Sequence, residues 1–318
     1  MTIAEPLQAR GRTAGSPFDL GDAAAYGRWR AHKLATAPRC LDELIVDVAD
    51  PFSLTPQERD ALLDRCARAN MAVYRGPADA ADASLPRALG RQLGLVRLDA
   101  NWLAEEDGIS HIAVSERRDG DGGRGGFIPY TDRAIRWHTD GYYHPDARRI
   151  HGMILHCVRP AAEGGVNALL DHELAYIALR DADPGHVAAL MAGDAMTIPA
   201  REGEGGVARV AQSGPVFSVD TSGALHMRYT ARTRSIEWKD DAATRAAVAC
   251  LEAFLAAADA PVWRLRLEAG MGIVANNVLH ERTAFADDPL RPRLLYRARY
   301  LDRVARPHAP GGEPWRNG

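Results

Sequence analysis

Three candidate metal ligands constrain this chain most strongly: the pair in His138-Thr139-Asp140, and His280 far downstream. On an extended strand, residues i and i+2 point to the same face of the sheet. His138 and Asp140 could therefore present one imidazole and one carboxylate to a single metal ion. A second imidazole from another strand, that of His280, would complete the set. The fold must then bring two strands that are distant in sequence close together.

Two histidines and one carboxylate hold three positions of an octahedron and leave three open, as non-haem Fe(II) oxygenases require for cosubstrate and dioxygen. A His-x-Asp motif alone arises often by chance, and most of the 11 histidines must be structural. A basic segment that ends in Arg293 and Arg297 closely follows His280, however, and strengthens the pattern. The sequence therefore predicts a metal site formed by His138, Asp140 and His280.

The segments between these motifs predict mainly short strands, accompanied by a few helices. Thr55-Pro56-Gln57-Glu58 has the form of a capping box and predicts a helix start. The expected helices are residues 56–68, 171–180, 184–191 and 241–257. The expected strands are residues 44–48, 71–74, 215–220, 224–229, 262–267, 272–275 and 294–300. Many short strands with covering helices are typical of a double-sheet jelly roll, the architecture of cupins.

Four motifs follow one another along the chain: Trp137-His138-Thr139-Asp140, Glu163-Gly164-Gly165-Val166-Asn167, Asn277-Val278-Leu279-His280 and Arg293-Leu294-Leu295-Tyr296-Arg297. Their order and approximate spacing resemble those of the taurine dioxygenase / 2,4-dichlorophenoxyacetate dioxygenase family, over roughly residues 44–302. The resemblance implies a mostly β fold with covering helices, the double-stranded β-helix (jelly roll, cupin-like). It also implies Fe(II), 2-oxoglutarate as cosubstrate and O2, with His138, Asp140 and His280 as iron ligands.

The resemblance further implies two arginines four residues apart, of which the first binds the distal carboxylate of 2-oxoglutarate. Arg293 and Arg297 match that spacing, and the planar guanidinium suits a carboxylate. Arg293 lies slightly farther beyond His280 than is usual in the family, so Arg291 remains an alternative. Asn167 stands where the family usually has a threonine that touches the same carboxylate, and an amide can donate that hydrogen bond too.

Arg297 matches the position that binds the anionic group of the substrate in the taurine enzyme, which implies a small anionic substrate. It could equally serve the cosubstrate or a structural ion pair. Related halogenases replace the acid at the position of Asp140, so its presence favours hydroxylation or a related C–H oxidation. Tyrosines are expected to line the pocket, with ordinary packing as their alternative role: Tyr142 and Tyr229, together with Tyr130 and Tyr143.

The alternatives to an enzyme of this kind are a non-catalytic cupin-like small-molecule binding protein that uses the same pocket and a zinc-dependent hydrolase. The complete ligand set and the arginine pair disfavour the first. The second lacks an evident general base. The sequence leaves open the identity of the substrate, the oxidative outcome and the oligomeric state, with a homo-oligomer as one option.

Composition and segment character predict one domain, residues 19–305, between a flexible arm at 1–18 and a flexible tail at 306–318. A formal net charge of -3 without a basic stripe argues against a nucleic-acid partner. No apolar segment reaches the length of a membrane span or a signal-peptide core. Four cysteines without CxxC spacing are interpreted as free thiols. We therefore expect a cytoplasmic protein.

Overall fold

The computed structural model describes residues 15–99, 107–114, 127–203, 206–233 and 236–305. Residues 1–14 and the tail expected at 306–318 lie outside this part. Phe18 corrects the expected end of the arm, because its side chain is 6% exposed and its ring packs edge-on against Trp29 and Tyr176. The main-chain oxygen of Pro17 also accepts a hydrogen bond from Arg180. Residues 17 and 18 are therefore anchored to the folded domain, because burial of an aromatic ring is strongly favourable.

Four of the six helices in the described part begin and end within two residues of where the sequence predicts them. The helices of the described part are α1 (Ala23–Thr36), α2 (Pro56–Ala69), α3 (Leu85–Gln92), α4 (His172–Ala182), α5 (Pro184–Leu190) and α6 (Ala242–Ala256), with short 3-10 turns at Leu41–Leu44, Ile128–Tyr130 and Asp146–Arg148. The capping box at α2 is confirmed, since Thr55 and Glu58 each accept a hydrogen bond from the other's main-chain N–H. The sequence did not predict α1 or α3.

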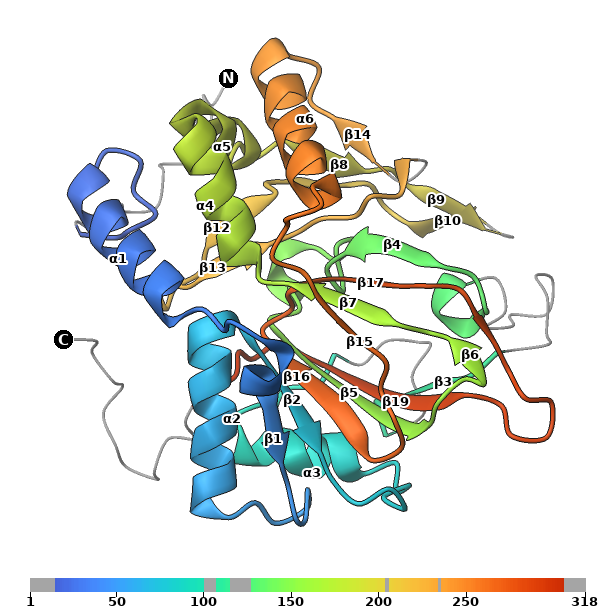
Figure 1. Ribbon diagram of the computed structural model, residues 1–318. Coiled ribbons are helices and arrows are strands. Elements are labelled where there is room, and N and C mark those ends of the chain that lie inside the picture. Colours follow the sequence, from blue (N-terminus) through green and yellow to red (C-terminus); the bar gives the residue numbers. More distant parts are fainter. Residues whose placement is uncertain (1–14, 100–106, 115–126, 204–205, 234–235, 306–318) are drawn as a thin grey trace.

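Two main sheets form the framework (Figure 1). The six-stranded sheet has the order β1 (Ile45–Asp47), β2 (Met71–Arg75), β16 (Met271–Ala275), β5 (Gly152–Arg159), β19 (Leu294–Tyr300) and β3 (Ser110–Ile112). The four-stranded sheet has the order β15 (Trp263–Leu265), β7 (Asn167–Leu170), β17 (Leu279–Arg282) and β4 (Ile135–His138). Within these sheets only β1 and β2 pair in parallel.

The remaining strands form small antiparallel sheets. They are β6 (Glu163–Gly164) with β18 (Phe285–Ala286), β12 (Phe217–Val219) with β13 (Leu225–Met227), β9 (Arg201–Gly203) with β10 (Gly206–Arg209), and β8 (Met196–Ile198) between β11 (Gln212–Gly214) and β14 (Glu237–Trp238). The β12–β13 pair confirms the two strands predicted at residues 215–220 and 224–229.

The core follows the two-residue periodicity of the strands. Met71 and Val73 of β2 point into the cluster between the sheets, where they meet Leu169 of β7, whereas Ala72 and Tyr74 point to the opposite face. On that opposite face α2 and α3 cover the six-stranded sheet. The helices α4, α5 and α6 pack together on the outer side of the four-stranded sheet (Figure 1). The result is a β-rich fold with covering helices.

A buried ion cluster joins three helices. The ammonium group of Lys33 on α1 lies 2.6 Å from Asp171 Oδ2 and 2.5 Å from Glu173 Oε2, at the start of α4. It also donates to the main-chain oxygen of Arg68 on α2, at 2.8 Å. Lys33 is 4% exposed, so its charge depends on these acceptors.

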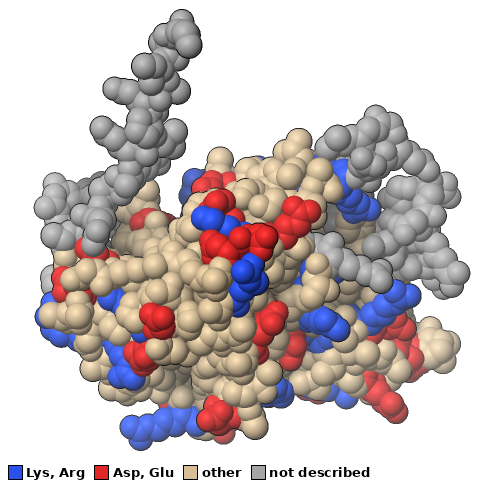
Figure 2. Space-filling view, turned by 90° about the horizontal axis from the view of Figure 1, so that it is seen from above, with Lys and Arg blue, Asp and Glu red and all other residues tan. Residues whose placement is uncertain are grey.

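The surface carries both signs of charge. On the face seen in Figure 2, acidic and basic side chains are interspersed over a largely uncharged surface. Among the described residues, no helix combines the length and apolar character needed to cross a bilayer.

Candidate metal centre

The two candidate histidine ligands face each other on neighbouring strands of the four-stranded sheet. In the antiparallel pairing of β17 with β4, His280 stands directly opposite His138, and their ring centroids lie 4.1 Å apart. Directly opposed residues of an antiparallel pair project from the same face. One donor atom from each of His138, Asp140 and His280 lies within 4.8 Å of the other two. The fold therefore brings together the three side chains that the sequence predicts.

Main-chain acceptors fix the orientation of both imidazoles. The Nδ1 atom of His138 lies 2.9 Å from the carbonyl oxygen of Arg136, and Nδ1 of His280 lies 2.9 Å from that of Val278. A carbonyl only accepts, so each Nδ1 carries the proton and each Nε2 presents a lone pair. Burial lowers the pKa of His138 to about 3 and also lowers the pKa of His280. Both rings are therefore neutral donors at neutral pH.

Asp140 reaches the site by a route that the sequence did not predict. The strand β4 ends at His138, so the simple alternation of a strand does not extend to Asp140. Instead, Asn277 holds this residue: its Oδ1 accepts from the Asp140 N–H at 2.7 Å, and its Nδ2 donates to the Asp140 carbonyl at 3.0 Å. Asn277 has a φ of 51°, in the left-handed region that asparagine tolerates. These two hydrogen bonds, which we call the Asn277 clamp, orient the Asp140 carboxylate where no strand does so.

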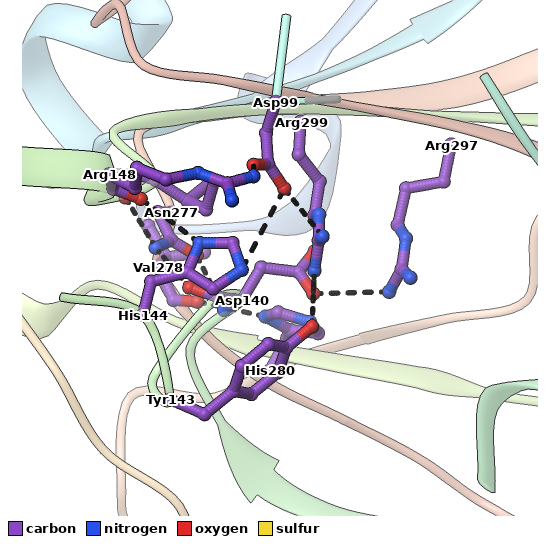
Figure 3. A network of polar contacts seen from close by, with 11 residues as sticks. Asp99, Asp140, Tyr143, His144, Arg148, Asn277, Val278, His280, Arg297 and Arg299 are labelled. Carbon is purple, nitrogen blue, oxygen red and sulfur yellow. Dashed lines mark hydrogen bonds and ion pairs between the residues drawn. The ribbon is translucent and has the colours of Figure 1, made fainter. Parts of the chain in front are cut away.

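The two oxygens of the Asp140 carboxylate have different surroundings. Oδ1 lies 3.1 Å from Nη1 of Arg297 and 3.8 Å from Nη1 of Arg299 (Figure 3). Oδ2 is buried and has no hydrogen-bond partner among the described residues. Burial alone would raise the pKa of Asp140, but the guanidinium of Arg297, followed by that of Arg299, lowers it overall. A charged, buried oxygen without a partner beside two neutral imidazole nitrogens fits a divalent metal ion.

Arg293 and Asn167, the predicted cosubstrate residues, both lie close to Gly165. Arg293 is 4% exposed, its guanidinium carbon lies 4.9 Å from the centre of the Phe285 ring, and it forms no ion pair with any described residue. Its Nε lies 3.8 Å from where a Cβ would stand on Gly165, and Asn167 donates to the Gly165 carbonyl at 3.5 Å. Arg291 is exposed. A buried cation without a direct ion pair suits a bound anion.

The predicted pocket tyrosines separate into two groups. Tyr142 is partly buried, and its ring packs edge-on against that of Tyr143, with centroids 5.3 Å apart. Tyr229 and Tyr130 are each 1% exposed and belong to the core clusters. The burial of Tyr229 and Tyr130 agrees with the packing role that was their alternative, and a substrate contact of Tyr229 stays a prediction. The substrate contact of Tyr142 stays a prediction.

Several residues at the site carried no predicted role. Arg299 could have been found by the two-residue periodicity of a strand, because it follows Arg297 on β19 at the spacing that shares a face. Arg282 pairs in register with Asn167, and its guanidinium lies 4.7 Å from the Phe285 ring centre and forms no ion pair in the described part. Asp99 lies outside every motif, and no sequence pattern indicated a role for it.

Two half-buried imidazoles and one buried carboxylate thus form a candidate facial metal site in a β-rich protein. The chain belongs to the taurine catabolism dioxygenase TauD, TfdA family, whose model matches residues 34–299.

Two curated relatives share the same name. A uridine-5'-phosphate dioxygenase from Amycolatopsis sp is 34% identical over 175 residues, which are 52% of this chain and 60% of the relative. A uridine-5'-phosphate dioxygenase from Streptomyces sp is 35% identical over 187 residues, 56% of this chain and 65% of the relative. The match thus spans less than two thirds of either relative.

Solved structures agree on the fold. The non-heme iron oxygenase OrfP in complex with Fe and alpha-ketoglutaric acid aligns with a TM-score of 0.53 at 16% identity, over 78% of this chain and 80% of that chain. The PvcB protein from Pseudomonas aeruginosa aligns with a TM-score of 0.54 at 16% identity, over 80% and 84%. At this identity the likeness concerns the fold alone.

Proposed function

We propose that the protein is an Fe(II)- and 2-oxoglutarate-dependent dioxygenase that oxidises a C–H bond of a small anionic substrate. The observation that carries this proposal is the buried Oδ2 of Asp140, which has no partner in the described part and stands with His138 and His280 as a set of three donors. Fe(II), when bound there, would supply the dioxygen chemistry that converts 2-oxoglutarate to succinate and CO2 as the substrate is oxidised.

The residues of the chain would divide the remaining tasks. Arg293 would meet the distal carboxylate of 2-oxoglutarate with two parallel hydrogen bonds, and its burial without an ion pair supports this role. The Asn167 amide, 7% exposed beside the same glycine, would donate a further hydrogen bond. Arg291, being exposed, offers a weaker site for the cosubstrate.

The substrate proposal rests on Arg297. Its Nε is buried and has no acceptor among the described residues, so an anionic group of the substrate could take that hydrogen bond. The two relatives named uridine-5'-phosphate dioxygenase make a nucleoside 5'-monophosphate the first candidate. Tyr142, which is partly buried and follows Asp140 by two residues, would line the same pocket.

We further infer that the two main sheets are the halves of a double-stranded β-helix, the jelly roll of cupins. The shared apolar cluster between the sheets and their antiparallel pairing support this assignment. The metal ligands of β4 and β17 would then lie inside it.

Succinate formation from 2-oxoglutarate tests the proposed function. The Fe(II)-loaded protein would be given uridine 5'-phosphate, a sulfonate, an aryloxyalkanoate and a betaine in turn, with succinate and O2 uptake measured together and His280→Ala as the control. We expect succinate formation and O2 consumption in equal amounts with at least one of these anions, and neither with His280→Ala. Binding of Fe(II) and 2-oxoglutarate without succinate from any substrate would instead support the non-catalytic binding protein. Turnover without O2 would support a hydrolase.

A further inference from the structure

A second arginine stands beside the Asp140 carboxylate and is fixed far more firmly than Arg297. Nη2 of Arg299 lies 2.6 Å from Asp99 Oδ2, and its Nη1 donates to the Tyr143 hydroxyl at 3.0 Å (Figure 3). The same Nη1 lies 3.8 Å from Asp140 Oδ1. The side chains of Arg299 and Asp99 are 3% and 0% exposed, so the pair is removed from water.

Asp99 is itself held in place on several sides. Its main-chain N–H donates to the carbonyl of Arg299 at 2.8 Å, so backbone and side chain join the same two residues. Its Oδ1 lies 2.5 Å from Nη2 of Arg148, and His144 Nε2 lies 3.9 Å from its Oδ2. Removing one member of a buried, hydrogen-bonded pair leaves an uncompensated charge, so these contacts resist separation. Arg299 therefore has a fixed position whatever occupies the pocket.

Arg297 differs in this respect. Asp140 is its one acidic partner within the described ranges, and no second carboxylate there anchors its guanidinium as Asp99 anchors that of Arg299. Both arginines lie on β19 at positions i and i+2, so both point to the face that carries the metal centre. If Arg297 turns to the substrate, as the proposed function requires, Asp140 needs another cation to hold its outer oxygen.

We propose that Arg299, anchored by Asp99, is the permanent positioning residue for the metal-binding carboxylate, which leaves Arg297 free to bind the substrate. This inference rests on the proposed function. With Oδ1 directed to a fixed guanidinium, Asp140 would present its buried Oδ2 to the metal.

Metal affinity in the absence of turnover tests this division of roles. The metal-free chain would be titrated with Mn(II) and followed by calorimetry and electron paramagnetic resonance. Loss of a residue that orients a ligand weakens metal binding by roughly 10- to 100-fold, and we expect this for Arg299→Gln. We expect Arg297→Gln to stay well under tenfold. Asp99→Asn should act in the direction of Arg299→Gln. Arg75→Gln, which removes a half-exposed arginine from its ion pair with Asp47 on the neighbouring strand, is the control outside this cluster and should bind Mn(II) as wild type does.

Thermal unfolding monitors the fold of each variant. Arg299→Lys is a second variant at the same position, and it keeps the buried positive charge. Its single ammonium group cannot span Asp99 and Asp140 together, so its Mn(II) affinity should also fall. Wild-type affinity in a folded Arg299→Gln or Arg299→Lys would overturn the inference, as would an equal loss in Arg297→Gln. Failure of the wild-type chain to bind Mn(II) more tightly than His280→Ala would instead refute the proposed function itself.

Discussion

Substitution of Arg293 by methionine should selectively weaken 2-oxoglutarate binding. Methionine keeps much of the volume beside Phe285 but removes the charge and all the hydrogen-bond donors of the guanidinium. Arg293 is 4% exposed and forms no ion pair in the described part of the chain, so the change breaks no direct contact with an internal carboxylate. The loss should therefore appear in cosubstrate affinity and not in folding.

The structure indicates the size of this effect. Truncating one member of a buried, hydrogen-bonded charge pair costs about 2–5 kcal/mol, which corresponds to roughly 30-fold to a few thousandfold in affinity. Two neighbours would reduce the loss. The Asn167 amide lies beside the same Gly165, and Arg282 stacks on the same Phe285 ring. We therefore expect the lower part of the range, about 2–3 kcal/mol.

Calorimetric titration of the Mn(II)-loaded protein with 2-oxoglutarate under nitrogen would measure this affinity without turnover. Arg291→Met is the matched control, because it makes the same substitution two residues earlier at an exposed position, and it should bind as wild type does. If Arg291→Met loses the affinity and Arg293→Met keeps it, the cosubstrate site belongs to Arg291 and the argument from burial is wrong.

Three further predictions concern neighbouring features. Arg297→Gln should raise the KM for the substrate far more than that for 2-oxoglutarate, with uncoupled succinate formation persisting; steady-state kinetics that show the opposite split would contradict an anion-binding role. Asn277→Ala should weaken Mn(II) binding by at least about tenfold. Because it leaves the Asp140 N–H unsatisfied, it should also lower the free energy of unfolding by about 1–3 kcal/mol. A variant with unchanged metal affinity would show that the two hydrogen bonds from Asn277 to Asp140 are not needed for metal binding. Lys33→Met should cost about 3–5 kcal/mol at pH 7 in urea unfolding. Burial alone would raise the pKa of Asp171, but Lys33 lowers it overall. The stabilisation of the fold by this ion pair is therefore present above the ordinary carboxyl pKa. The difference in the free energy of unfolding between wild type and Lys33→Met should narrow as the pH falls below about 4. A gap that stays constant with pH would refute this account of the cluster.

Local patterns in the sequence predicted much of the fold. The strand β19 begins and ends where expected, at Leu294 and Tyr300, because its apolar and aromatic residues have a clear strand character. The capping box of α2 uses only residues within one turn, so it too could be found locally. By contrast, α1 buries only Ala25 and Lys33, and such a helix lacks the apolar stripe from which helices are predicted.

The sequence predicted which residues meet at the site but not the contacts that orient them. The type and spacing of His138, Asp140 and His280 indicated a metal centre, and the structure brings them together. What aims Asp140 is the clamp by Asn277, a contact between segments 137 residues apart. The pairing of Asp99 with Arg299 joins segments 200 residues apart. Such contacts depend on the tertiary fold, and no local periodicity reports them.

Anaerobic titration with Fe(II) and 2-oxoglutarate tests most directly whether His138, Asp140 and His280 form an open iron site. We predict that each wild-type chain binds one Fe(II), and that 2-oxoglutarate then binds one-to-one and produces the charge-transfer absorption of a chelated iron complex. Replacing any one of the three residues by alanine should abolish both in a folded protein. Retention of stoichiometric Fe(II) in all three variants, or equal 2-oxoglutarate binding with and without iron, would contradict the account.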